Sequence, residues 1–179
     1  MKLLGNRFGP LLLIVGVMWA VHFVNLLFPW DLNAYGIHPR SLGGLLGILF
    51  APFLHGDFGH LIGNTISLLI LGGIVSLRSR RNFVKITLPL ILLAGVGVWL
   101  LGRNSVHIGA SGLVFGYFGY VSTRGFYDRD FVSILVSLAV IILFGGMLWG
   151  VLPVNSRISW EGHLFGLIGG FLVARYLKK

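Results

Sequence analysis

Four polar residues in an otherwise apolar sequence could together perform hydrolysis. Ser111 lies between small residues in HIGASGLVFG, residues 107–116, and its hydroxyl could act as a nucleophile. His163, in WEGHLFG, could take the proton from that hydroxyl as a base. His60 and Asn64, both in HGDFGHLIGN, could donate hydrogen bonds to the oxyanion that forms when a carbonyl is attacked. This combination is typical of acyl transfer by a serine nucleophile.

Each of these residues also has a structural interpretation. A serine in a string such as GASG more often packs a helix than attacks a carbonyl, and the strand–turn–helix context of a soluble hydrolase is missing. A single histidine within a membrane could be a packing residue, a proton relay or a ligand. Asn64 could simply bridge two helices. The functional interpretation therefore requires the four residues to lie together in the fold.

Other hydrolytic mechanisms do not fit the sequence. The chain has no cysteine, so a thiolate nucleophile and a zinc–thiolate site are excluded. None of the five acidic residues forms the facing pair within the membrane that an aspartyl mechanism needs. An HExxH motif is absent, and His55 and His60 are five residues apart, the wrong spacing for one helix face. Glu161 would point away from His163 on a continuous helix, so the serine mechanism would run as a Ser111–His163 dyad.

The composition predicts a membrane protein. The 179 residues are 56% hydrophobic and 11% charged, whereas soluble domains are about one-quarter charged. The apolar residues form long runs, and a bilayer crossing needs about 20 residues. We therefore predict an all-α membrane protein, a single integral membrane domain over residues 1–179 with a bundle of six spans at about 10–28, 58–77, 86–102, 108–123, 131–152 and 160–177.

The basic residues predict how the chain crosses the membrane. With a cytoplasmic N-terminus, eleven Lys and Arg residues fall on the cytoplasmic side and only three fall outside, namely Arg40, Arg103 and Arg157. Both termini are then cytoplasmic, and the net charge of +9 suits an anionic lipid leaflet rather than a nucleic acid. Spans two, four and six all begin at the outer face, so the four polar residues should converge at similar depth.

Residue spacing adds detail to this convergence. His60 and Asn64 are four residues apart, on one helix face. Small residues at intervals of four let membrane helices approach closely, and glycines follow Ser111 and surround His163 in this way. We expect spans four and six to lie backbone against backbone, with Ser111 within hydrogen-bond reach of His163. Polar groups at this depth require an enclosed, wetted cavity open to the outer aqueous phase. His107, in an outer connection, is expected to be solvated or interfacial.

The chain resembles the rhomboid intramembrane serine proteases of the compact six-span bacterial type. The resemblance covers essentially the whole chain and rests on GIHPRS in the first outer loop, HGDFGHLIGN, GASG and GHLFGLIGG. It implies that Ser111 is the nucleophile and His163 the general base. It also implies that His60, Asn64 and the Ser111 backbone N–H hold the oxyanion.

The resemblance has implications for the surroundings of these residues. Gly109 and Gly112 would shape the loop around the nucleophile, and the first outer loop, roughly 29–57, would lie partly embedded beside the helices. Span five and the loop after it would form a lateral gate. Phe115 stands where some relatives carry a tyrosine that stacks on the catalytic histidine; it can stack but has no hydroxyl. A glutamate that many relatives carry near the inner end of span two is missing, which leaves the anchoring of the first loop open.

The implied activity is hydrolysis of a peptide bond in or near a transmembrane helix of another membrane protein, without a metal or cofactor. The implied location is the bacterial inner membrane, with the site toward the periplasmic or extracellular side. Two alternatives remain. The chain could be a catalytically silent rhomboid-like protein that binds membrane helices. It could also be a small proton or ion transporter that uses His60, Asn64 and His163, although an inverted repeat and a mid-membrane carboxylate are missing. The sequence does not indicate the oligomeric state.

Overall fold

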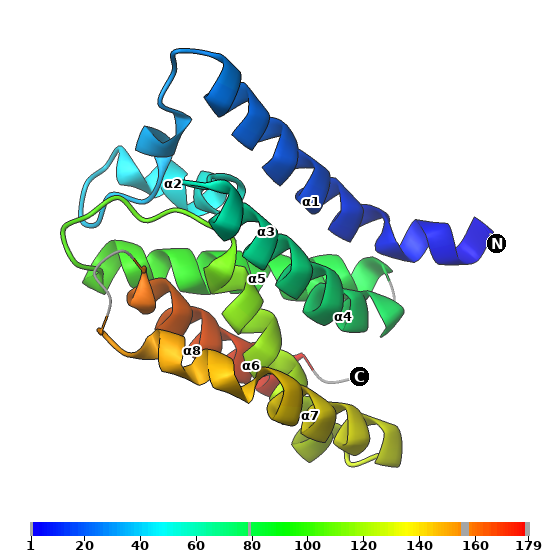
Figure 1. The fold of residues 1–179 in the computed structure, drawn as a ribbon. Coiled ribbons are helices and arrows are strands. Elements are labelled where there is room, and N and C mark those ends of the chain that lie inside the picture. Colours follow the sequence, from blue (N-terminus) through cyan, green and yellow to red (C-terminus); the bar gives the residue numbers. More distant parts are fainter. Residues whose placement is uncertain (1, 79, 155–157, 178–179) are drawn as a thin grey trace.

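The fold of the chain is built from helices (Figure 1). The computed structural model describes residues 2–78, 80–154 and 158–177. The α-helices are α1 (Lys2–Leu27), α2 (Gly44–Phe50), α3 (Phe58–Ser67), α4 (Gly73–Arg78), α5 (Arg80–Leu101), α6 (Ser111–Asp128), α7 (Phe131–Phe144) and α8 (Trp160–Tyr176). Shorter helical turns are η1 (Leu32–Tyr35), η2 (Ala51–Phe53), the π-helical η3 (Leu68–Gly72) and η4 (Gly145–Val151).

Four helical segments are long and apolar enough to cross a membrane: Arg7–Leu27, Phe58–Leu77, Asn82–Leu101 and Phe131–Val151. The second joins α3, η3 and α4, and the fourth joins α7 and η4. The helices α6 and α8, with 18 and 17 residues, are not among the four. An integral membrane protein is therefore indicated, whereas the six-span count and the cytoplasmic termini remain predictions.

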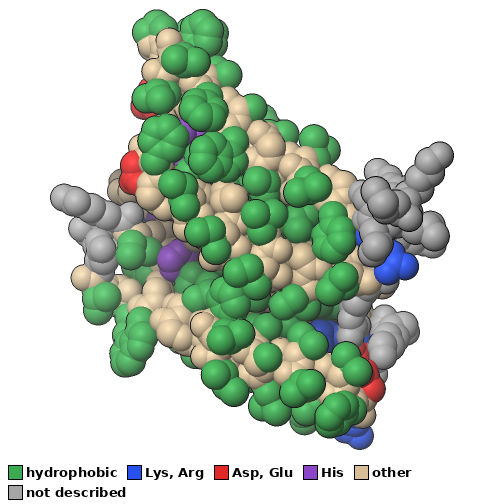
Figure 2. Space-filling view, turned by 45° about the vertical axis from the view of Figure 1, so that its right-hand side comes forward, with side chains coloured by type: hydrophobic (Ala, Val, Ile, Leu, Met, Phe, Trp, Pro, Cys, Tyr) green, Lys and Arg blue, Asp and Glu red, His purple; other side chains and the backbone are tan. Residues whose placement is uncertain are grey.

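The surface agrees with a lipid environment. On the face shown in Figure 2, hydrophobic side chains cover the flank of the molecule, and the visible Lys and Arg side chains lie at one end. The helix α7 and the adjoining η4 expose Ile142, Leu143 and Trp149 by 79%, 76% and 74%. Since so much exposed apolar surface would be unfavourable in water, this flank is suited to contact with acyl chains.

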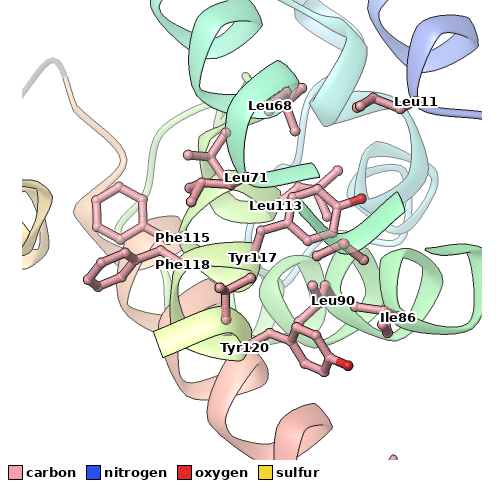
Figure 3. Close-up of a cluster of buried hydrophobic side chains, with 14 of the residues drawn as sticks. Leu11, Leu68, Leu71, Ile86, Leu90, Leu113, Phe115, Tyr117, Phe118 and Tyr120 are labelled. Carbon is pink, nitrogen blue, oxygen red and sulfur yellow. The ribbon is translucent and has the colours of Figure 1, made fainter. Parts of the chain in front are cut away.

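The main apolar core surrounds α6 (Figure 3). Tyr117 of α6 is fully buried, and Leu68 and Leu71 of η3 are packed in the same cluster as Leu90 of α5. Most residues of α6 are buried, including Arg124, which forms an ion pair with Asp128. The helix that begins at Ser111 is thus enclosed by neighbouring helices over most of its length.

Glycines allow α6 and α8 to meet backbone against backbone, as the sequence predicts. A Cβ atom added to Gly166 would meet the backbone of Gly112, at 2.9 Å from its carbonyl carbon. A Cβ atom on Gly170 would lie 2.7 Å from the backbone nitrogen of Tyr120, and one on Gly119 would lie 2.6 Å from the Leu167 carbonyl oxygen. Any larger residue at these positions would separate the two helices that carry Ser111 and His163.

The first outer loop is anchored to the outer end of α5. Arg40 donates hydrogen bonds from Nη1 to the carbonyl oxygens of Gly102 (2.7 Å) and Leu100 (3.4 Å), and its backbone N–H donates to the Trp99 carbonyl. The Trp99 indole in turn donates to the Ser41 carbonyl at 2.8 Å. A cation at the carbonyl end of a helix is favoured by the helix dipole. These bonds hold the loop without the glutamate that is missing from span two.

Candidate active site

The four polar residues selected from the sequence line one cavity of about 680 Å³. They come from three helices: His60 and Asn64 from α3, Ser111 from α6, and His163 from α8. Other residues of its wall come from the outer connection between α5 and α6 and from η4. The structure therefore brings together, around a single space, residues separated by up to about 100 positions in the chain.

Ser111 is the first residue of α6 and follows a sharp backbone turn. Gly109 has φ +108°, a conformation that residues with a side chain rarely adopt, and its N–H donates to the Ala51 carbonyl at 2.8 Å. The first backbone hydrogen bond within α6 runs from Val114 to Ala110. The N–H groups at the start of the helix thus have no partner within it and give this end a partial positive charge. The predicted span begins at residue 108, three residues before the observed helix.

His163 has a defined ring orientation. Its Nδ1 lies 2.8 Å from the Gly150 carbonyl oxygen, and Phe115 stacks on the ring with centroids 4.1 Å apart and an interplanar angle of 8°. Because a carbonyl only accepts, Nδ1 carries the hydrogen and Nε2 keeps its lone pair in the neutral ring. Ser111 and His163 line the same cavity, but in the described part of the chain no direct hydrogen bond joins them. Such contacts often tighten only when substrate binds.

His60 and Asn64 converge on the backbone just before the nucleophile. A Cβ atom added to Gly109 would lie 2.5 Å from His60 Nε2 and 3.5 Å from Asn64 Nδ2. The Asn64 amide nitrogen is buried and has no hydrogen-bond partner among the described residues. At the start of α3, Asp57 accepts from the His60 backbone N–H at 2.8 Å, which lowers the pKa of the Asp57 carboxyl. Two side-chain donors are therefore available beside Ser111.

Gly112 is the second residue of α6, and Glu161 is the second residue of α8. A Cβ atom on Gly112 would lie 3.3 Å from both the Gly162 carbonyl oxygen and the Ala94 Cβ. Glu161 is buried and accepts a hydrogen bond from the backbone N–H of Arg103 at 3.0 Å, not from His163. Glu161 therefore does not act as the third member of a Ser-His-carboxylate triad.

His107 is buried, so the expectation of a solvated or interfacial side chain is wrong. Its backbone forms a β-bridge with Ile37 of the first outer loop. Its ring lies between Ser159, whose Oγ is 2.7 Å from Nδ1, and the Arg103 carbonyl, 3.1 Å from Nε2. Ser159 also caps α8 by accepting from the Gly162 N–H. This network links the first outer loop, the connection that leads to Ser111 and the helix that carries His163.

Two further histidines lie behind His60. His22 of α1 is buried, with Nδ1 3.2 Å from the His55 carbonyl oxygen, and the rings of His55 and His60 meet edge-on with centroids 5.0 Å apart. Both ring nitrogens of His55 lack a hydrogen-bond partner among the described residues, and burial lowers its pKa to about 4. His55 is therefore neutral near pH 7. Within the described ranges, no group of three His, Cys, Asp or Glu side chains could hold a metal ion.

Comparisons with known proteins relate this chain to a protein family. A model of the Rhomboid domain matches residues 42–179. The uncharacterized protein Rv1337 of Mycobacterium tuberculosis is 38% identical over 176 residues, which cover 93% of this chain and 73% of that protein. A protein of Bacillus subtilis named putative rhomboid protease YdcA is 29% identical over 179 residues, covering 94% and 88%. RHOMBOID-like protein 4 of Arabidopsis thaliana is 30% identical over 135 residues, covering 70% and 32%.

Proposed function

Since the chain belongs to the rhomboid family, we propose that it is an intramembrane serine protease in which Ser111 is the nucleophile and His163 the general base. The observation that carries the proposal is the shared cavity, which places a serine, a histidine with a free Nε2 and two side-chain donors around one space. Helix packing alone does not require these four side chains to lie around the same cavity.

In the proposed reaction, His163 Nε2 accepts the hydroxyl proton as Ser111 Oγ attacks a peptide carbonyl. The hydrogen bond from Nδ1 to the Gly150 carbonyl stabilises the imidazolium that results. His163 then gives the proton to the leaving amine, and water hydrolyses the acyl-enzyme. The cavity has room for that water. Exposed residues such as Asp57 and Ser105 form part of its lining, so water can enter it from outside.

The negative charge that develops on the carbonyl oxygen would be held by the Ser111 backbone N–H and by His60 and Asn64. The position of Ser111 at the start of α6 adds the positive end of the helix dipole. The unpartnered Asn64 amide supports this assignment, because a buried donor without a partner is costly unless a ligand or an intermediate supplies the acceptor.

The substrates would be other membrane proteins, cut at a peptide bond in or near a transmembrane helix. A helical bond is shielded by its own hydrogen bonds, so small or helix-breaking residues near the site of cleavage lower the cost of unwinding. The active site would face the periplasmic or extracellular side of a bacterial inner membrane, since the strongly basic ends of the helices are assigned to the cytoplasm.

A fluorophosphonate probe tests this proposal on purified protein in detergent, together with cleavage of a model transmembrane substrate. The wild type should react with the probe and cleave, and Ser111→Ala and His163→Ala should do neither. Ser122→Ala is a matched control, because Ser122 lies on the same helix and its hydroxyl bonds the Gly119 carbonyl. A folded wild type that neither reacts nor cleaves would refute the proposal and favour the silent helix-binding protein.

A further inference from the structure

The partner of His163 Nδ1 lies in η4, the turn that follows α7. In a Ser-His-Asp triad, a carboxylate binds this nitrogen and fixes the histidine tautomer. Here the atom that accepts the hydrogen bond is the Gly150 carbonyl oxygen, at 2.8 Å. The nitrogen that receives the serine proton is therefore set by a backbone group of η4.

Gly150 can approach the base only because it has no side chain. A Cβ atom at this position would lie 3.0 Å from His163 Nδ1 and 3.1 Å from Phe115 Cζ. The imidazole is stacked on Phe115 at one face and bonded to the Gly150 carbonyl at its edge. By contrast, Cβ atoms on Gly145 and Gly146, in the same turn, would meet no atom within 4 Å. The close approach is thus specific to one of the three glycines of η4.

The turn η4, which carries Gly150, is only partly enclosed by the rest of the protein. η4 contains no buried residue, and α7 packs chiefly against α6. Met147 of η4 lines the cavity beside His163, whereas Trp149 is 74% exposed on the outside. The same turn therefore contacts both the base and the surroundings of the protein.

We propose that Gly150 is a positioning residue that couples η4 to the base: its carbonyl holds His163 in the Nδ1–H form only while η4 lies against α8. The inference rests on the proposed function and names a regulation of the same site. A displacement of η4 from α8 would break this hydrogen bond, and proton transfer from Ser111 would then lack the lone pair on Nε2 that accepts the proton.

Histidine tautomers can be measured by NMR with ¹⁵N-labelled imidazole, on the full chain in detergent. Wild-type protein should show the Nδ1–H form at His163, and Gly150→Ala should show the Nε2–H form or a mixture. Gly146→Ala, the matched control, should keep the wild-type form. Repeating the measurement in a Ser111→Ala background makes the readout independent of catalysis.

Kinetics provide the second measurement. Gly150→Ala should lower kcat for the model substrate by about 10²-fold, because a misplaced catalytic group commonly costs this much, with KM changed less than about twofold. An Nε2–H tautomer in the wild type would overturn the inference, even if the variant fails to fold. So would an equal loss of kcat in Gly146→Ala. A wild type that shows the Nδ1–H form but does not react with the fluorophosphonate would instead refute the proposed function.

Discussion

The contact between α6 and α8 can be tested by adding one methyl group at a time. Gly166→Ala places the methyl against the Gly112 backbone, one residue from Ser111, and Gly170→Ala places it against Tyr120 N at 2.7 Å. Gly169→Ala is the matched control, because its methyl meets the side chain of Leu93, at 3.1 Å from Cβ. All three changes occur in one helix and bring the same gain in helix propensity.

The magnitude follows from the distances. A methyl on Gly166 would lie 2.9 Å from the Gly112 carbonyl carbon, and ordinary carbon contacts are about 3.5–4.0 Å, so the helices must separate by roughly 1 Å. Overpacking costs about 1–3 kcal/mol, offset by about 0.5–1 kcal/mol from replacing a helical glycine. We expect a net loss of about 1–2 kcal/mol for Gly166→Ala and Gly170→Ala, and little change for Gly169→Ala.

Activity should separate the two destabilised variants. A 1 Å misplacement of reacting groups can cost about 10²-fold in rate, so Gly166→Ala should lose most of its kcat. Gly170 lies seven residues beyond His163, roughly 10 Å along the helix, so Gly170→Ala should retain more activity at equal loss of stability. Unfolding in detergent and cleavage of a model substrate measure both quantities. Wild-type stability and activity in Gly166→Ala would refute the backbone contact.

Three further changes test other parts of the site. Gly109→Ala would place a methyl 2.5 Å from His60 Nε2, at a residue whose φ is +108°. We expect kcat to fall by about 10²–10³-fold, as it does when one oxyanion donor is lost. A wild-type kcat would contradict the assignment of His60 as a donor. Glu161→Ala removes the acceptor of the Arg103 N–H and should lower the free energy of unfolding by about 1–3 kcal/mol. Glu161→Gln keeps an acceptor and should lower it less. Equal losses in the two variants would contradict this role of Glu161. The pKa of His55 is about 4 in the folded protein, against an ordinary value of 6.5. As the pH decreases, the unfolded chain therefore binds this proton before the folded chain does. The free energy of unfolding should fall by about 3 kcal/mol in all between pH 6.5 and pH 4. His55→Phe should be about as stable as the wild type at pH 7.5 and lose this part of the pH dependence; parallel unfolding curves from pH 7.5 to 4 would argue against it.

The start of a helix is predicted best from the sequence where a capping residue directly precedes an apolar run. The predicted span 58–77 matches α3, η3 and α4, because Asp57 caps the start of the run. The predicted span 160–177 likewise matches α8, which Ser159 caps. The apolar pattern predicts that α6 ends at residue 123, five residues too early, because Arg124 and Asp128 lie outside the apolar run of the sequence. Their buried ion pair lets the helix continue.

The network around His107 could not be predicted from the sequence. Its partner Ser159 is 52 residues away and belongs to another helix start, so no local spacing indicates the contact. A polar residue in an outer connection is exposed by default, and burial depends on what the tertiary fold places over it. The sequence did indicate that Glu161 does not pair with His163, because residues two apart point in different directions on a helix.

The helices that carry Ser111 and His163 both fall outside the set of long apolar helices. α8 has only 17 residues, whereas the absence of α6 is explained by its position. A helix that contacts lipid must be apolar over its whole length, as in Phe131–Val151, whereas α6 is enclosed by protein and can hold the buried ion pair of Arg124. Its composition is set instead by the close approach to α8, which requires glycine at the contact. The hydropathy of the sequence therefore identifies helices that face lipid, and the spacing of small residues identifies helices that pack inside the bundle. A polar cavity within a membrane needs both kinds of helix.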